Sequence, residues 1–262
     1  MSAELSPAEK GKFISARRAV DYVQDGMKLG LGTGSTAAWM VKCLARRVQQ
    51  EGLQISCAAT STRTAELAKS LGLDVRALDD LGWLDLTIDG ADEFDPELSL
   101  IKGGGAALLQ EKIVASASDQ MIVITDPAKE VASLGAFPLP VEVIPFGAMT
   151  TKALIEQMLT EMDVAGREVT LRMAGDKALR TDENNLILDL HLQKIGNARE
   201  LSLMLNQIPG VVENGLFIDI CDIVVIGDGA GKVTVKDISD GSSHTEAVTV
   251  TAADYSFADP KQ

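Results

Sequence analysis

The first half of the chain alternates short apolar segments with longer amphipathic ones, and this alternation restricts the possible folds most strongly. Apolar residues 27–31 are short enough for a strand, and they lead through a glycine turn into a segment with apolar residues at helical spacing. The same pattern predicts strands at 55–60, 73–78, 84–88 and 121–125, and helices at 62–71 and 106–117. Strands that alternate with helices are joined by right-handed crossovers. The sequence therefore predicts an α/β fold with a Rossmann-like, doubly wound and mostly parallel sheet.

From Pro140 onward the order of the predicted elements changes to β-α-β-β-α-β, the split arrangement of ferredoxin-like domains. The predicted strands are 141–144, 169–173, 186–190 and 211–217, and the helices are 151–161 and 197–206. A strand at 222–226 would return the chain to the large sheet, so the smaller α+β domain is expected to be an insertion. We expect a Rossmann-like catalytic domain of residues 1–138 and 218–262, and a ferredoxin-like domain of residues 139–217. We expect residues 236–262 to be a C-terminal extension, and the chain beyond Asp228 to form an extra edge hairpin or a loose tail.

The charge of the chain limits its partners. The formal net charge of −14 comes from 38 acidic and 24 basic residues, which argues against a nucleic acid because polyanions need a basic surface. A phosphorylated ligand would need local lysines and helix N-termini. No apolar run approaches the ~18 residues that span a bilayer, and residues 6–9 begin a capped helix instead of an export signal. We therefore expect no membrane partner and a cytoplasmic location.

The residue types available for chemistry are few. The cysteines are three in number and widely spaced, which predicts buried, reduced thiols. Only His191 and His244 could supply imidazole, so we expect neither a metal nor a cofactor. The dinucleotide motif G-x-G-x-x-G fails at Ser35, and residues 227–232 lack the P-loop spacing. The chemistry must then rest on carboxylates, lysines and backbone groups.

Four short segments lie where strands of the large sheet should end, which is where ligands bind in open α/β sheets. The first is a turn of small residues that could let backbone N–H groups approach an anion, although an ordinary tight turn also explains it: Thr33, Gly34, Ser35 and Thr36. The second has three acidic residues among five: Asp89, Gly90, Ala91, Asp92 and Glu93. Such a cluster could recognise hydroxyl groups, transfer protons or bind a hard cation, and a solvated acidic turn also explains it.

A lysine and three consecutive glycines form the third segment: Lys102, Gly103, Gly104 and Gly105. Such glycines lose much conformational entropy on folding, so they indicate a close approach of the backbone to a ligand. Glu111 lies ~9 Å further along the following helix and is a candidate for the same pocket. Lys129, after the strand at 121–125, is the fourth candidate, and a surface lysine explains it equally well.

Read together, these segments resemble the ribose-5-phosphate isomerase family of the A type. The resemblance rests on residues 32–37, 60–61, 89–93, 102–107 and 111–112, and it continues through 137–143, 186–189 and 208–217. It implies a Rossmann-like domain with an inserted ferredoxin-like domain. It also implies that the protein interconverts D-ribose 5-phosphate and D-ribulose 5-phosphate through an enediolate, as in the non-oxidative pentose phosphate pathway.

The resemblance implies roles for individual residues. The glutamate that matches Glu111 is the base, and the residues that match Asp89, Asp92 and Lys102 line the sugar site. The turn at 33–36 and the lysine that matches Lys129 contact the substrate. We expect Asp89 to exchange a proton during ring opening and Asp92 to fix hydroxyl groups. Such isomerases are usually homodimers or homotetramers.

Two other functions remain open from the sequence. A non-catalytic sugar-phosphate sensor on the same fold would bind the ligand to regulate a partner, although an intact Glu111 argues against it. An enzyme similar to a CoA-transferase would use the glutamate as a nucleophile instead of a base. The chain also departs from the family at residues 181–185, and the segment after about Lys236 exceeds the usual length.

Overall fold

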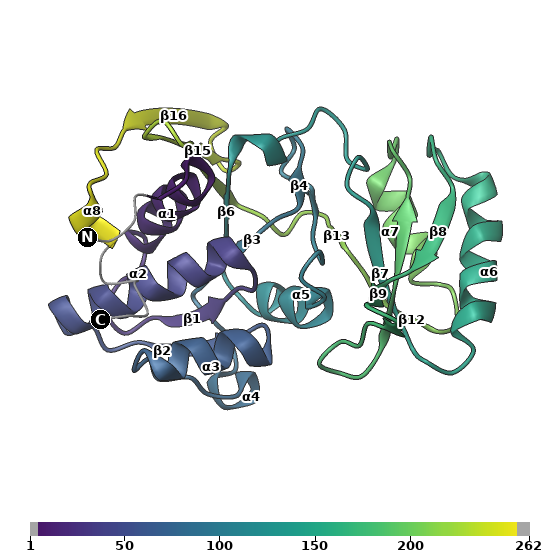
Figure 1. Cartoon of the computed structure of the whole chain (residues 1–262), viewed down its shortest axis with the longest axis horizontal. Helices are drawn as coiled ribbons and strands as arrows, with labels where there is room; N and C mark the ends of the chain where they lie inside the picture. Colours follow the sequence, from purple (N-terminus) through teal and green to yellow (C-terminus); the bar gives the residue numbers. More distant parts are fainter. Residues whose placement is uncertain (1–4, 256–262) are drawn as a thin grey trace. The chain divides into compact units, whose positions relative to one another are not determined.

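The computed structural model describes residues 5–255 and divides them into two compact units (Figure 1). Unit 1 consists of residues 5–90, 113–129 and 220–255, and unit 2 of residues 91–112 and 130–219. None of the helices within residues 5–255 combines the length and apolar character that crossing a bilayer requires.

Unit 1 is built on a seven-stranded sheet in the order β16-β15-β14-β6-β3-β1-β2. Its strands are β1 (Lys28–Leu31), β2 (Ser56–Ala59), β3 (Leu86–Gly90), β6 (Met121–Thr125), β14 (Ile223–Gly227), β15 (Lys232–Asp237) and β16 (Ser242–Ala247). The five strands from β14 to β2 are parallel, and β15 and β16 add an antiparallel hairpin at one edge. The predicted mostly parallel sheet is confirmed, and beyond Asp228 the chain forms the expected edge hairpin, from β15 and β16. Residues 256–262 of the predicted extension lie outside the described residues.

Helices cover both faces of this sheet, since alternate residues of a strand point to opposite faces. The helices of this part are α1 (Pro7–Val20), α2 (Ser35–Glu51), α3 (Thr62–Ser70), α4 (Leu78–Leu81), α5 (Leu108–Ser116) and α8 (Ala252–Tyr255). On one face, Leu29 and Leu31 of β1 join the core that α1 and α2 complete. On the other, a side chain at Gly30 would clash with Val114 of α5. The Ser6 hydroxyl accepts a hydrogen bond from Glu9 N, so α1 begins with the predicted cap.

The strand predicted at 73–78 is wrong. Only Val75 pairs with β2, through a single bridge to Cys57, and the chain then turns into the short helix α4. Leu81 packs with Leu84 and Val114 instead of extending the sheet. Residues 73–77 alternate apolar and polar side chains, which is the pattern of a strand, and tertiary packing overrode this local preference.

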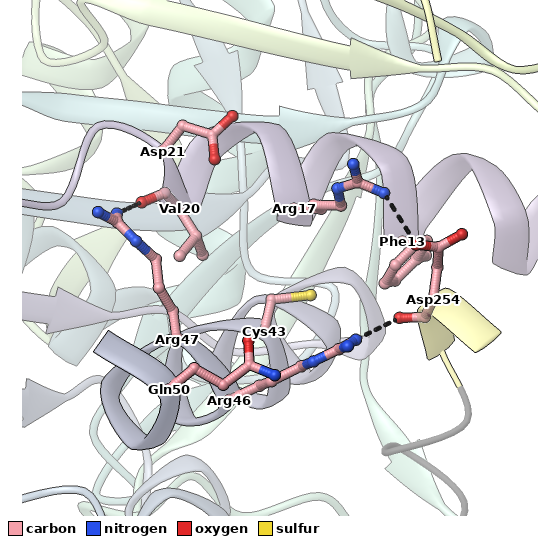
Figure 2. Close-up of a pocket in the computed structure, with 9 residues that line it drawn as sticks. All are labelled: Phe13, Arg17, Val20, Asp21, Cys43, Arg46, Arg47, Gln50 and Asp254. Carbon is pink, nitrogen blue, oxygen red and sulfur yellow. Dashed lines mark hydrogen bonds and ion pairs between the residues drawn. The ribbon is translucent and has the colours of Figure 1, made fainter. Parts of the chain in front are cut away.

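A cavity of about 240 Å³ lies among α1, α2 and the C-terminal segment of unit 1 (Figure 2). Arg17 Nη1 lies 3.6 Å from Asp254 Oδ1, and Arg46 Nη1 donates a 2.9 Å hydrogen bond to Asp254 O. The Tyr255 ring packs edge-on against Phe13, with centroids 6.0 Å apart. These contacts fasten the end of the extension to the first two helices. The cavity contains none of the residues predicted to carry chemistry.

Unit 2 contains a four-stranded antiparallel sheet in the order β12-β7-β11-β8. Its elements are β7 (Leu139–Val143), α6 (Ala148–Met158), η2 (Leu159–Glu161), β8 (Glu168–Leu171), β11 (Leu186–His191), α7 (Ala198–Leu205) and β12 (Val211–Asn214), with a hairpin of β9 (Met173–Ala174) and β10 (Lys177–Ala178). The chain order β7-α6-β8-β11-α7-β12 and the pairing of every neighbour as antiparallel are the ferredoxin-like arrangement that the sequence predicts.

A second, three-stranded sheet belongs to unit 2 and explains why the units differ from the predicted domain boundaries. It joins β4 (Glu93–Phe94), β5 (Leu100–Ile101) and β13 (Leu216–Phe217). Residues 91–112 and 130–138, expected in the larger domain, therefore pack in unit 2. The boundaries at 138/139 and 217/218 stay a prediction about domains, distinct from these compact units.

The carboxyl of Glu142, on β7, is buried inside unit 2. Its Oε1 accepts 2.9 Å hydrogen bonds from Thr181 Oγ1 and Asn185 Nδ2. Burial disfavours the charged form and raises the pKa of Glu142 above its ordinary value of 4.5, although the two hydrogen bonds oppose this. The protonated Glu142 carboxyl therefore contributes fully to the free energy of unfolding below the pKa that it has in the unfolded chain. This contribution is lost as pH rises through its pKa in the folded protein.

Glu142→Gln is therefore expected to flatten the decline in unfolding free energy above pH 4.5, because a neutral amide releases no proton. Urea unfolding of both proteins at several pH values between about 4.5 and 8 measures this slope. Glu156→Gln, on the surface of α6, is the control and should keep the wild-type slope. Equal slopes for Glu142→Gln and the wild type would show that the burial of this carboxyl has no thermodynamic weight.

Candidate active site

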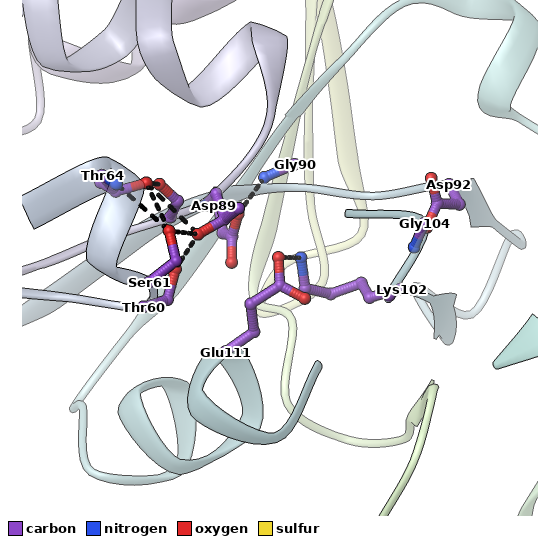
Figure 3. Close-up of polar contacts among 12 residues, drawn as sticks. Thr60, Ser61, Thr64, Asp89, Gly90, Asp92, Lys102, Gly104 and Glu111 are labelled. Carbon is purple, nitrogen blue, oxygen red and sulfur yellow. Dashed lines mark hydrogen bonds and ion pairs between the residues drawn. The ribbon is translucent and has the colours of Figure 1, made fainter. Parts of the chain in front are cut away.

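Four hydroxyl groups meet where β1 and β2 of unit 1 end. Thr33 Oγ1 lies 2.8 Å from both Thr60 Oγ1 and Ser61 Oγ, and 3.3 Å from Thr64 Oγ1. All four residues are buried, and Figure 3 shows Thr60, Ser61 and Thr64 directed toward this cluster. The Thr33 side chain thus anchors the turn to the end of the neighbouring strand.

Asp89 is the second-last residue of β3 in the same unit, and the backbone of the turn holds its carboxylate. Its Oδ1 accepts hydrogen bonds from Thr33 N at 3.0 Å and Gly90 N at 2.7 Å. Gly32 makes this approach possible, because a Cβ there would lie 2.1 Å from Asp89 Oδ1 and 2.5 Å from Asp89 Cα. The predicted turn and the first predicted acid are therefore direct neighbours.

The rest of the turn begins helix α2. Gly34 is the N-cap, with φ of 119°, and has no side chain to cap the helix. Ser35 and Thr36 are the first two residues of the helix. Backbone N–H groups in a first turn have no partner within the helix and favour an anion. The substrate-binding role of residues 33–36 stays a prediction. Lys129, after β6, is half-buried in the 3-10 helix η1 (Pro127–Lys129).

In unit 2, Lys102 and Glu111 form a buried ion pair. Lys102 follows β5 directly and Glu111 lies in the first turn of α5, and Lys102 Nζ is 3.2 Å from Glu111 Oε1 (Figure 3). Their side chains are only 2% and 5% exposed. A charge pair so far removed from water interacts more strongly than one on the surface, and its partners are costly to separate. The structure thus brings together the predicted base and the predicted cation.

The glycine segment between them is held by Asp92 and by an arginine. Asp92 Oδ2 accepts a 2.7 Å hydrogen bond from Gly104 N, and a Cβ at Gly104 would lie 2.6 Å from Asp92 Oδ1. Gly103 has φ of 111°, a backbone conformation that residues with a side chain rarely adopt. Its carbonyl oxygen accepts a 2.7 Å hydrogen bond from Arg172 Nη1. Gly105 is exposed. Asp92 follows Ala91, the first residue of this unit, and its carboxylate therefore fixes the conformation of the glycine loop.

Sequence reasoning missed three residues around this pair. Arg172 holds the glycine loop and forms an ion pair with Asp189, while Phe217 and Lys112 lie beside Lys102 and Glu111. Their side-chain contacts are made with residues distant in the chain, so no local motif marks them. Lys112 follows Glu111 directly in the sequence, which is a signal for it, but two adjacent residues of opposite charge are typical of a solvated surface.

Among residues 5–255, no three His, Cys, Asp or Glu side chains group so as to hold a metal ion. The cysteines Cys43, Cys57 and Cys221 all fall in this range, and they are buried and form no disulfide. Burial raises the pKa of the Cys43 and Cys57 thiols to about 12. The prediction of buried, reduced thiols is confirmed.

The mostly parallel sheet and the buried lysine–glutamate pair define the chain as a mixed α/β protein with a candidate acid–base site. Residues 56–231 match the family model described as ribose 5-phosphate isomerase A (phosphoriboisomerase A). The chain belongs to the ribose 5-phosphate isomerase A family.

Individual relatives cover the whole chain. It is 63% identical over 262 residues to ribose-5-phosphate isomerase A of Jannaschia sp. strain CCS1, covering 100% of both proteins. It is 67% identical over 259 residues to the protein of that name from Cereibacter sphaeroides strain ATCC 17029, covering 99% of each. Among solved structures, a D-ribose-5-phosphate isomerase in complex with phospho-erythronic acid is 38% identical, with a TM-score of 0.81 over 89% of this chain and 100% of that one.

Proposed function

We propose that this protein is an aldose–ketose isomerase that interconverts D-ribose 5-phosphate and D-ribulose 5-phosphate in the non-oxidative pentose phosphate pathway. The observation that carries the proposal is the buried contact between Lys102 Nζ and Glu111 Oε1, 3.2 Å apart. It joins a carboxylate that can move a proton to a cation that can stabilise negative oxygen. Membership of the family supports the choice of substrate.

Glu111 is the base in this mechanism. Its carboxylate removes the proton from C2 of the open-chain aldose, and the electron pair of that C–H bond forms a C1–C2 double bond while the C1 carbonyl becomes an enediolate oxygen. The same carboxyl then returns the proton to C1, and the proton of the C2 hydroxyl passes to the negative C1 oxygen, so that C2 becomes the ketone and C1 carries a hydroxyl. One carboxyl thus serves both steps of the proton transfer.

Lys102 and the glycine loop stabilise the negative oxygen that develops. The ammonium is fixed by the Glu111 contact, and Gly103, Gly104 and Gly105 present backbone where no side chain hinders approach. The solved structure of a D-ribose-5-phosphate isomerase in complex with phospho-erythronic acid supports this chemistry, because the carboxylate of a sugar acid resembles the two oxygens of an enediolate. Asp92 fixes the loop through Gly104 N, in addition to its expected contact with sugar hydroxyls.

Residues 33–36, 89–91 and 129 bind and open the sugar. The turn of Thr33, Gly34, Ser35 and Thr36 contacts an anionic part of the substrate. The N–H groups for this contact come from the first turn of α2, which begins at Ser35, because Thr33 N already donates to Asp89 Oδ1. Asp89, with Gly90 and Ala91 after it, exchanges a proton during ring opening. Lys129 adds a positive charge for the substrate in a protein whose net charge is −14.

We also propose that the protein is a cytoplasmic homodimer or homotetramer that needs no cofactor. Three buried thiols without a disulfide suit a reducing compartment, and exposed apolar side chains such as Leu154 and Leu203, 40% and 63% exposed, suit self-association. A monomeric mass in sedimentation equilibrium would contradict the assembly.

The function is tested by incubating the purified protein with ribose 5-phosphate and a chelator in D₂O. We expect ribulose 5-phosphate to form with deuterium at C1, because a carboxyl base exchanges its proton with solvent. NMR measures the deuterium in the product. Binding without turnover would instead establish the sugar-phosphate sensor. A glutamyl adduct trapped by hydroxylamine would establish the transferase-like alternative.

A further inference from the structure

Phe217 packs against the ammonium groups of two lysines in unit 2. Its side chain is fully buried, Lys102 Nζ lies 5.5 Å from the ring centroid, and Lys112 Nζ lies 5.0 Å from it. We propose that Phe217 is a positioning residue for the isomerisation, whose aromatic face holds the Lys102 ammonium against Glu111. This inference deepens the proposed function and rests on it for its kinetic consequences.

The backbone of Lys102 is fixed by the strand that carries Phe217. Strand β13 pairs with β5 in the register Phe217↔Leu100 and Leu216↔Ile101. The two β5 residues of these pairs directly precede Lys102. Lys102 N then donates a 2.9 Å hydrogen bond to Gly215 O. A Cβ at Gly215 would lie 2.3 Å from Lys102 O, so only glycine permits this approach. The same short strand therefore places both the main chain and the ring.

Each of the two ammonium groups at the ring has its own anionic partner. Lys102 contacts Glu111, whereas Lys112 Nζ donates to Glu213 Oε1 at 2.9 Å and to Asn214 O at 2.6 Å. Burial lowers the pKa of Lys112, an effect that the contact with Glu213 opposes. Glu111 and Lys112 are adjacent in sequence, so an exchange of partners between the two pairs is the nearest competing arrangement. The ring attracts both cations, and the register of β13 keeps the pairs distinct.

The size of the effect follows from the attraction between an ammonium and an aromatic face. It is stronger where water is excluded, as it is beside a side chain only 2% exposed. Loss of the aromatic face while the apolar volume is kept should therefore lower kcat by about 10- to 30-fold. KM should change less than about 3-fold, because the fully buried ring acts through a catalytic group.

The test replaces Phe217 by leucine and, through site-specific incorporation, by mono-, tri- and pentafluorophenylalanine. Fluorine withdraws the negative charge of the ring face with little change in ring size, so we expect kcat to fall stepwise with each fluorinated residue while Tm changes little. The same residues at Phe146, which is 90% exposed, serve as the matched control and should leave kcat unchanged. A kcat within about 2-fold of wild type for the pentafluoro variant would overturn the inference.

A measurement without turnover separates this inference from the proposed function. In protein labelled with ¹³C-lysine, the Cε protons of Lys102, assigned with Lys102→Met, should resonate upfield because of the ring and shift back in Phe217→Leu. An unchanged resonance overturns the contact itself. If the shift is seen but the wild type forms no ribulose 5-phosphate, the proposed function fails and the catalytic role of Phe217 fails with it, while the contact stands.

Discussion

Glu111→Gln is expected to lower kcat by about 10²- to 10⁴-fold, the usual contribution of a general base. Glutamine has nearly the same size and shape as glutamate, but its amide does not accept the C2 proton. The variant also leaves Lys102 without the carboxylate that lies 3.2 Å from its ammonium, so unfolding free energy should fall as well. Steady-state kinetics with ribose 5-phosphate, together with thermal unfolding, measure both effects.

The control for this variant is Glu156→Gln, which removes a surface carboxylate from its contact with Lys152 on α6 and should leave kcat unchanged. Glu111→Asp adds a second test, since it keeps the carboxylate and withdraws it by one methylene; we expect activity above that of Glu111→Gln. Deuterium should no longer enter the product at an appreciable rate in Glu111→Gln. Full activity in that variant would mean that another group is the base.

Lys102→Met is expected to lower kcat by about 10²- to 10³-fold, the loss that follows removal of one donor to a developing oxyanion. Methionine fills much of the apolar volume of the lysine stem but carries no charge. Its effect has two physical sources, because the enediolate loses a cation and Glu111 is left buried without its counter-charge. KM should change less than kcat, since the charge on the oxygen develops only during reaction.

A double-mutant cycle distinguishes a pair that acts as one unit from two independent groups. If Lys102 and Glu111 act together, Lys102→Met with Glu111→Gln should lose about as much activity as the worse single variant. Lys152→Met is the surface control for loss of a lysine. Losses that multiply in the double variant would show that the two residues contribute separately.

Much of the fold was predictable because its determinants are local. Strand β6 covers Met121–Thr125, as the uninterrupted apolar run predicts, and Ser6 caps α1 through a hydrogen bond three residues along the chain. Helical spacing of apolar residues likewise predicts α2. The order β-α-β-β-α-β then limits the topology of the smaller sheet to few possibilities.

The candidate site was predictable in its residues but not in its contacts. The end of the parallel strand β3 pointed to Asp89, since ligands bind beyond the carboxyl ends of such strands, and consecutive glycines pointed to Lys102 and Glu111. The expectation that the Lys102 segment ends a strand of the large sheet was wrong, because β5 pairs antiparallel with β4 and β13 in unit 2. That Asp92 holds the glycine loop by Gly104 N follows only from the structure. The assignment of roles to these residues stays a prediction.

Sequence by itself determined the periodicity, the caps and the polar turns, because these depend on neighbours within a few residues. Only the tertiary structure decided that residues 91–112 belong to unit 2, through two-residue strands too short to give a periodic signal. It alone placed the Phe217 ring beside the ammonium of Lys102, across a separation of more than 100 residues. Such a contact depends on the register of β13 with β5, which pairing and burial fix together once the chain has folded.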